Sequence, residues 1–339
     1  MPSLARRLLA LLSLVTLAAF PAAVLASTPI VIRFSHVVAV DTPKGQAAEL
    51  FKRRAAELTG GRVRVDVFPN GTGYKDYEEI QALQLGAVEL LAPSLSKFGP
   101  LGVKEFEAFD LPFLFEDEAA LHRVTEGPVG KALLLKLEPK GIVGLAFWDA
   151  GFKSFSANRP LRRPEDFKGL RMRIQASGVI DAQMRALGAL PQVLPFPDVY
   201  RALEAGVVDG CENPVSNFYT QGMHRVQRHL TLTHHGYLGY AVIANRRFWE
   251  ALPADVRRAL EQALGEATAL ANRLSREKEA ADLEAVRRAG TTVVFLPSRE
   301  ERQRFVRALL PVHRAMEDRV GREFLRSIHA ATGFDPTPR

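Results

Sequence analysis

The chain has 339 residues, of which 47% are hydrophobic and 24% charged, and it contains no low-complexity tract. This composition excludes a disordered chain and suits a folded protein of about two domains. The net charge is +7, but both signs are mixed along the sequence and no basic run alternates with aromatic residues. A nucleic-acid partner is therefore not expected. The single cysteine, Cys211, excludes an internal disulfide, so the core must stabilise the fold.

The first 26 residues have the pattern of a secretory signal peptide. Arg6 and Arg7 precede an apolar run of 13 residues, Leu8 to Phe20, and a small-residue cleavage site ends at Ala26. The run is shorter than the ~20 residues of a membrane-spanning helix, so we set aside the alternative of a retained anchor. No cysteine follows it to carry a lipid, and no later apolar segment is long enough to span a membrane. We expect a mature protein that begins near Ser27 and is free in the periplasm.

The first part of the mature chain alternates between strand and helix patterns. Strand patterns at 30–36, 63–67 and 88–92 are separated by helix patterns that begin at Thr42, a good N-cap, and near Asp76. This order predicts an α/β domain with a mainly parallel sheet. Ligands of such sheets lie beyond the carboxyl ends of the strands. Four polar residues occur at or just past such ends: His36, Lys44, Ser94 and Lys97.

The middle of the chain predicts a second α/β unit. Two helix patterns precede a strand at 142–147, which we expect to end at Trp148, and Gly151 then offers a crossing point into the second unit. Further strand patterns follow, with helices at 178–187 and 198–205 between them. The expected strands lie at 152–157, 170–174, 190–194 and 207–211.

The last third is mainly helical after a strand pattern at 237–244. Residues 255–289 have the pattern of one long helix that braces both domains, with a break at Gly265 as the alternative. A short strand at 291–295 follows. Ser298 is then a suitable N-cap for a mostly helical segment that continues to residue 328.

Residue patterns for catalysis are absent from the sequence. There is no His-Glu-x-x-His motif, no pair of cysteines and no Gly-x-Ser-x-Gly elbow. His234 and His235 fall in a strand pattern, where neighbouring side chains face opposite sides and do not bind one ion together. Cys211 is expected to be a packing residue rather than a nucleophile. We therefore expect neither an enzyme nor a metal or other cofactor.

A set of hydrogen-bonding residues instead indicates a carboxylate site. Lys153, Arg173 and Asn213 each lie where an apolar strand pattern ends. Arginine donates two parallel N–H bonds to a carboxylate, and lysine supplies a compact positive charge. Phe196, between two prolines, offers an aromatic wall, and Asn217 ends the same stretch. These residues predict a pocket for an organic acid.

Five segments, in order, resemble the solute-binding proteins of tripartite ATP-independent periplasmic (TRAP) transporters, and among them the dicarboxylate-binding DctP-like group. The resemblance covers nearly all of the mature chain. It is carried by the segments 34–45, 151–153, 169–173, 199–203 and 208–214. In that family the residue matching Arg173 forms a two-pronged salt bridge with the ligand carboxylate. The residues matching Lys153 and Asn213 add contacts, and that matching Phe196 packs against the ligand.

The resemblance further implies two α/β lobes that close on the ligand, a long helix spanning both, and delivery to membrane permease subunits without ATP. We expect residues 27–150 and about 239–278 in lobe I, and 151–238 and about 279–339 in lobe II, in a protein that acts as a monomer. Lys44 and Lys97 on lobe I are expected to face the cations of lobe II, which favours a C4-dicarboxylate such as succinate, malate or fumarate. The alternatives are a sugar acid, an aromatic acid or another monocarboxylate as ligand, or a sensing role with a receptor kinase.

Overall fold

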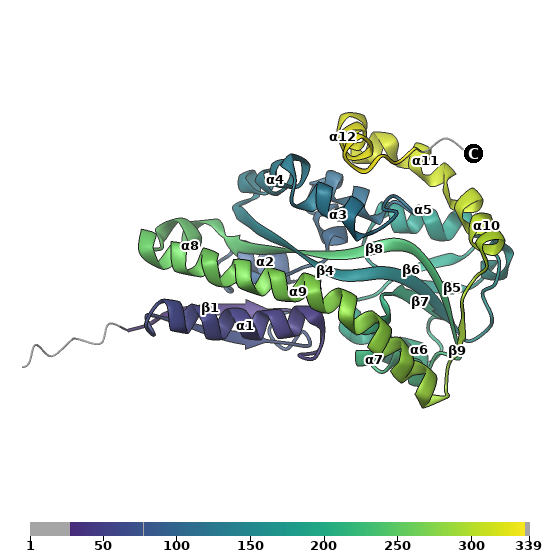
Figure 1. The fold of residues 1–339 in the computed structure, drawn as a ribbon, viewed down its shortest axis with the longest axis horizontal. Helices are drawn as coiled ribbons and strands as arrows, with labels where there is room; N and C mark the ends of the chain where they lie inside the picture. Colours follow the sequence, from purple (N-terminus) through teal and green to yellow (C-terminus); the bar gives the residue numbers. More distant parts are fainter. Residues whose placement is uncertain (1–27, 77, 336–339) are drawn as a thin grey trace, which may run out of the picture.

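A single mixed sheet forms the centre of the computed structural model, which describes residues 28–76 and 78–335 (Figure 1). The predicted signal peptide lies outside these residues. The strands are ordered β2-β1-β3-β8-β4-β7-β5-β6, and β9 pairs with β8. Their bounds are β1 Ile30–Ser35, β2 Val63–Phe68, β3 Leu90–Leu91, β4 Ile142–Ala157, β5 Arg171–Ile174, β6 Leu190–Val193, β7 Gly210–Asn213, β8 His229–Asn245 and β9 Val293–Phe295.

The two long antiparallel strands β4 and β8 run through both halves of the sheet. The predicted end of a strand at Trp148 is wrong, because β4 continues through Gly151 to Ala157. The predicted strand at 237–244 is likewise only the second half of β8. Register shifts between Asp149 and Gly151, and at two other places, let β4 bend without breaking, and Gly151 has a φ of +115°.

Helices cover both faces of the sheet, and several of them begin at a side-chain N-cap. At the start of α1, Thr42 accepts a hydrogen bond from the N–H of Gly45 at 3.0 Å. The segment predicted to be mostly helical after Ser298 is helical, but it is divided at Pro311 and Gly321. The bounds are α1 Pro43–Leu58, α2 Glu79–Gln84, α3 Glu118–Thr125, α4 Pro128–Leu135, α5 Gly178–Ala186, α6 Val199–Glu204, α7 Val215–Thr220, α8 Arg246–Ala251, α9 Ala254–Ala289, α10 Arg299–Leu309, α11 Pro311–Val320 and α12 Arg322–Thr332. No helix in the described part of the chain has the length and apolarity to cross a membrane.

Helix α9 is continuous over 36 residues, which confirms the prediction of one long helix (Figure 1). It packs against α1 in the first half of the molecule and α7 in the second. Its side chains also hold β4, since Thr268 accepts from the indole N–H of Trp148 at 2.8 Å and Asn272 accepts from the N–H of Asp149 at 3.0 Å. The helix therefore braces both halves on one side of the sheet.

The buried apolar residues form three clusters that follow this layout. One, around Phe34, Phe51 and Trp148, lies between α1, α9 and the first half of the sheet. A second, around Val199 and Phe218, lies mainly in the second half and also includes Val37 and Val38 of the first half. The third and largest contains residues of both halves, from Leu83 of α2 to Ile328 of α12. The molecule thus has two α/β halves joined by β4, β8, α9 and a shared core.

We predict that Gly265→Ala stabilises the protein. Gly265 lies on the exposed side of α9, and an added Cβ would meet no atom within 4 Å. Alanine lowers the conformational entropy of the unfolded chain, so the free energy of unfolding should rise by about 0.5–1 kcal/mol. Urea unfolding followed by circular dichroism measures the change. Gly45→Ala is the matched control: its Cβ would lie 2.4 Å from the carbonyl of Ala39, so that variant should be destabilised. A less stable Gly265→Ala protein would contradict the prediction.

Candidate functional site

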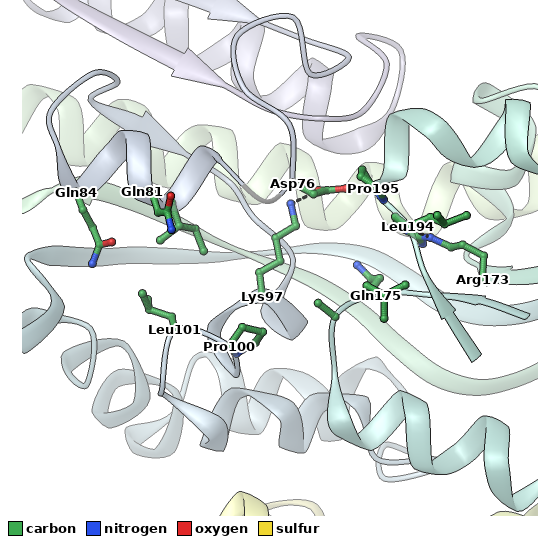
Figure 2. Close-up of a pocket in the computed structure, with 13 residues that line it drawn as sticks. Asp76, Gln81, Gln84, Lys97, Pro100, Leu101, Arg173, Gln175, Leu194 and Pro195 are labelled. Carbon is green, nitrogen blue, oxygen red and sulfur yellow. Dashed lines mark hydrogen bonds and ion pairs between the residues drawn. The ribbon is translucent and has the colours of Figure 1, made fainter. Parts of the chain in front are cut away.

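A cavity of about 280 Å³ lies between the two halves of the molecule (Figure 2). The first half contributes residues before and within α2 and from the turn Leu95–Phe98 onward, and the second half contributes the ends of β5 and β6. Two of the residues predicted from the sequence, Lys97 and Arg173, line it. Because both lobes supply walls, the cavity has the position expected for a ligand cleft.

Arg173, at the carboxyl end of β5, is held in a fixed orientation. Its Nε and Nη2 donate to the carbonyl of Leu194 at 3.0 and 2.8 Å, and its side chain is only 3% exposed. The guanidinium carbon lies 5.7 Å from the ring centre of Phe196, which is also buried. The structure therefore brings together the predicted arginine anchor and aromatic wall.

Lys97 lies between two carboxylates of its own half. Its ammonium forms ion pairs with Asp76 and Glu79. Burial alone would lower the pKa of Lys97, but the two carboxylates raise it to about 12. Asp76 also accepts the backbone N–H of Phe196, so its carboxylate joins the two halves directly. Burial works to raise the pKa of Asp76, yet Lys97 and this hydrogen bond hold it below its usual value.

Lys44 lies deeper in the first half, in a different environment. Its ammonium nitrogen donates to the carbonyl of Ala92 at 2.9 Å and lies 3.6 Å from the ring centre of Tyr240. Burial and the positive charge of Lys97 lower the pKa of Lys44 to about 7. His36 is fully buried, and burial followed by the charge of Lys44 lowers its pKa to about 3.

The predicted polar residues Ser94, Asn213 and Asn217 are all buried near this group. Ser94 accepts from the side-chain amide of Gln175 at 2.8 Å, a second hydrogen bond between the halves. Asn217 donates to the hydroxyl of Tyr240 at 3.4 Å. Asn213 makes only long contacts in this structure, 3.5 Å to the sulfur of Cys211. An amide with weak partners of this kind is suited to form a stronger hydrogen bond with a ligand.

Lys153 lies apart from Arg173. Its ammonium nitrogen is 2.7 Å from Glu212 and 3.6 Å from Asp110, and His235 contacts Glu212 at 2.8 Å. Arg173 is paired with Cys211 in the register of β5 and β7, and Glu212 is the next residue of β7. Successive strand residues face opposite sides, so Lys153 and Arg173 lie on opposite faces of the sheet.

The cluster around Lys153 combines one ammonium with two carboxylates. Burial opposes ionisation of Glu212, but Lys153 and His235 lower its pKa to about 2. Burial instead raises the pKa of Asp110 to about 6. Removing one member of such a buried set leaves an uncompensated charge. The cluster thus has a clear role in stability, and a contact of Lys153 with the ligand stays a prediction.

Four polar residues of the site were not identified from the sequence. Asp76 and Glu79 are three positions apart, and such a pair beside Lys97 has the spacing of one helix face. Gln175 directly follows the anchor strand β5, and Tyr240 lies within β8. None of these four residues is positively charged, so a prediction based on lysine and arginine does not include them. The carboxylates change the charge of the pocket and must be counted.

The residues considered for catalysis or metal binding have other roles. His235 is buried against Glu212, whereas His234 is partly exposed and lies 3.1 Å from Glu279, so the two histidines face different sides as predicted. Cys211 is buried beside Ser156 and Met223, and burial raises the pKa of its thiol. Among residues 28–76 and 78–335, no group of three or more potential metal ligands is placed around one point.

Comparisons with known proteins agree with this geometry. The model of the bacterial extracellular solute-binding proteins, family 7, matches residues 34–319. The C4-dicarboxylate-binding periplasmic protein DctP of Rhodobacter capsulatus is 58% identical over 304 residues, 90% of this chain and 91% of that protein. A TRAP periplasmic solute-binding protein of Shewanella oneidensis with bound succinate has a TM-score of 0.88 and 42% identity, covering 90% of this chain and 100% of that one. One of Pseudomonas aeruginosa PAO1 with bound L-malate has a TM-score of 0.82 and 41% identity, covering 85% of this chain and 100% of that one.

We predict that Lys153→Met destabilises the protein strongly. The change leaves Glu212 without its closest counter-ion in the core, so the free energy of unfolding should fall by about 3–5 kcal/mol. Denaturant unfolding of the ligand-free protein measures this loss. The control is Lys168→Met, at an exposed position, for which a change within about 0.5 kcal/mol is expected. Wild-type stability of Lys153→Met would show that the buried ion pair is not structural.

Proposed function

Because the chain belongs to the bacterial extracellular solute-binding proteins of family 7, we propose that it is the periplasmic subunit of a TRAP transporter and binds a C4-dicarboxylate. The family, the fold and a binding rather than an enzymatic role, all predicted from the sequence, are thereby confirmed. The ligand class is supported by the names and bound ligands of the relatives: a C4-dicarboxylate-binding protein at 58% identity and two structures with succinate and L-malate. The protein belongs in the periplasm, because its relatives are periplasmic binding proteins by name.

The observation that carries the ligand assignment is the buried Arg173 beside Phe196 at the wall of the cavity. One ligand carboxylate would form the two-pronged salt bridge with Arg173, with Asn213 as a hydrogen-bond donor. The second carboxylate would be taken up by the first lobe, where Lys44 and Lys97 supply charge and His36, Ser94 and Asn217 supply polar groups. Since Asp76 and Glu79 already pair with Lys97, we assign the larger share to Lys44. A monocarboxylate would leave Lys44 without a carboxylate partner.

We further propose that the two lobes meet at a hinge centred on Gly151. The proposed limits in β4 and β8 are directly opposite each other, because Gly151 pairs with Leu238. The limit in α9 lies at the same place: a Cβ on Gly151 would be 3.6 Å from Ser275 and 3.9 Å from Glu279. β4, β8 and α9 all pass from one proposed lobe to the other near Gly151. This position, beside a β-bulge, favours a bend there.

Closure of the lobes would enclose the ligand and form the surface that delivers it. The halves already touch at the cleft through Asp76 and Phe196 and through Lys75 and Asp198, 3.1 Å apart. We propose that the loaded monomer docks on the membrane permease subunits of the transporter. A ligand-sensing role with a receptor kinase is the alternative, and uptake of labelled succinate by vesicles that contain the permease distinguishes the two.

Substitutions of Arg173, the proposed anchor, test the binding assignment. Arg173→Ala should weaken succinate binding by roughly 2–5 kcal/mol, because the carboxylate loses its partner in a desolvated site. Arg173→Lys keeps the charge but loses the planar fork, so it should also bind markedly more weakly. Titration calorimetry of the mature protein, refolded to remove carried-over ligand, measures both. Arg171→Lys, two positions earlier in β5 and paired with Asp209 away from the cavity, is the control.

The outcomes separate the candidate ligands. Near-wild-type affinity of either Arg173 variant would show that this residue is not the anchor. Tight binding of a sugar acid, an aromatic acid or a monocarboxylate, with succinate, malate and fumarate silent, would keep the family and overturn the C4-dicarboxylate assignment. Binding of no acid at all would overturn the proposed function.

A further inference from the structure

Lys44 is a buried amine for which the described part of the chain provides no counter-ion. It is 1% exposed, and its nitrogen has one hydrogen bond, to the carbonyl of Ala92, and the face of Tyr240. The two other buried lysines of the cleft region differ in this respect. Lys97 has two carboxylate partners and Lys153 also has two.

The groups around Lys44 do not supply the missing charge. His36, after β1, is fully buried and interacts electrostatically with Lys44, and its low pKa keeps it neutral. Tyr240, on β8, is also neutral, since burial raises its pKa to about 12. Lys97, from the turn after β3, repels the ammonium, while Asp76 and Glu79, before and at the start of α2, attract it but are bound to Lys97. Desolvation therefore favours the uncharged amine.

We propose that Lys44 is largely uncharged in the free protein above neutral pH, and that binding a dicarboxylate takes up one proton from solvent onto its amine. This rests on the proposed function, because it requires a carboxylate to arrive at Lys44. An ammonium paired with a carboxylate is stable in a buried site, whereas an isolated ammonium is not. The second carboxylate of the ligand thus causes the Lys44 amine to take up a proton, and the resulting ammonium is its counter-ion. Lys44 is in this way a determinant of specificity for acids with two carboxylates.

The charge balance of the cleft supports the same conclusion. With Lys44 uncharged, the positive charges of Arg173 and Lys97 are matched by Asp76 and Glu79. A dianion entering this neutral group would bring two uncompensated charges, which is costly in a desolvated pocket. Protonation of Lys44 removes one of them. A monocarboxylate held at Arg173 would not reach Lys44 and would bind without this proton.

The consequence is a pH dependence of affinity with a defined sign. Lys44 has a pKa of about 7 in the free protein, and a neighbouring carboxylate raises that pKa in the complex. Below pH 7 the amine already carries its proton, so affinity is nearly constant while the ligand stays a dianion. Above pH 7 each unit costs up to a factor of ten, and the dissociation constant for succinate should rise about 25-fold between pH 6.5 and 8.5.

Titration calorimetry of the wild-type mature protein with succinate tests this directly. Heats measured in phosphate and in Tris, two buffers of very different ionisation enthalpy, give the number of protons bound with the ligand. About one proton per succinate is expected at pH 8.5, and about 0.2 at pH 6.5, where succinate is still almost entirely a dianion. Equal heats in both buffers at pH 8.5, or a dissociation constant unchanged from pH 6.5 to 8.5, would overturn the proposal. Absence of binding at pH 6.5 would instead contradict the proposed function.

A pair of variants of helix α1 assigns the proton to its residue. Lys44→Met should bind succinate more weakly at pH 6.5 than the wild type, with little further loss at pH 8.5 and no proton uptake. Lys52→Met, at an exposed position of the same helix, should keep both the affinity and the uptake of the wild type. If Lys44→Met binds with an unchanged proton number, the proton resides elsewhere, for example on Glu79 or Asp110, and the proposal is wrong. If Lys44→Met does not fold, the wild-type calorimetry alone decides.

Discussion

The carboxylate of Asp76 contacts both halves of this protein at the cleft. It pairs with Lys97 in its own half and accepts the N–H of Phe196 in the other, and its negative charge also acts on Arg173. A chain carboxylate is therefore held by the kinds of group that we assign to a ligand carboxylate. The contacts between the halves at the cleft thus use the same chemistry that we propose for recognition of the solute. Because a charge buried without a partner is costly, the positions of the surrounding cations follow from this constraint.

The proposed hinge at Gly151, together with helix α9, would allow the contact between the two halves to form and break. The crossings of β4, β8 and α9 lie close together at Gly151, so in the proposed hinge a small change of angle there would move the lobes as bodies. Contacts at the cleft include polar ones, such as that between Gln175 and Ser94, whereas the core that joins the halves is extensive and apolar. Polar contacts exchange more readily for contacts with water or ligand than the contacts of an apolar core do.

Helix caps and hydrophobic periodicity correctly predicted the elements that depend on neighbouring residues alone. Thr42 caps its helix as expected, and α9 is continuous although Gly265 lies within it. The continuity of β4 was missed, because Asp149 to Gly151 are poor strand formers and remain in the strand only through pairing with β8. Pairing partners far along the chain are not visible in a local pattern.

The same distinction applies to the site. Arg173 and Phe196 lie together as predicted, since both follow directly from the ends of neighbouring strands. The position of Lys153 could not be predicted, because it depends on the register that directs Glu212 toward it. Asp76 was missed because the prediction considered positive charges without their counter-ions. Sequence reasoning found the family and the pairing of Arg173 with Phe196, and the structure supplied the charge balance.

The most direct test of this account is a crystal structure of the mature protein with succinate. The account predicts a closed protein in which one carboxylate lies on the guanidinium of Arg173, against Phe196, and the other lies within hydrogen-bond distance of the Lys44 amine. Succinate bound with neither carboxylate on Arg173, or outside the cleft between the lobes, would contradict it.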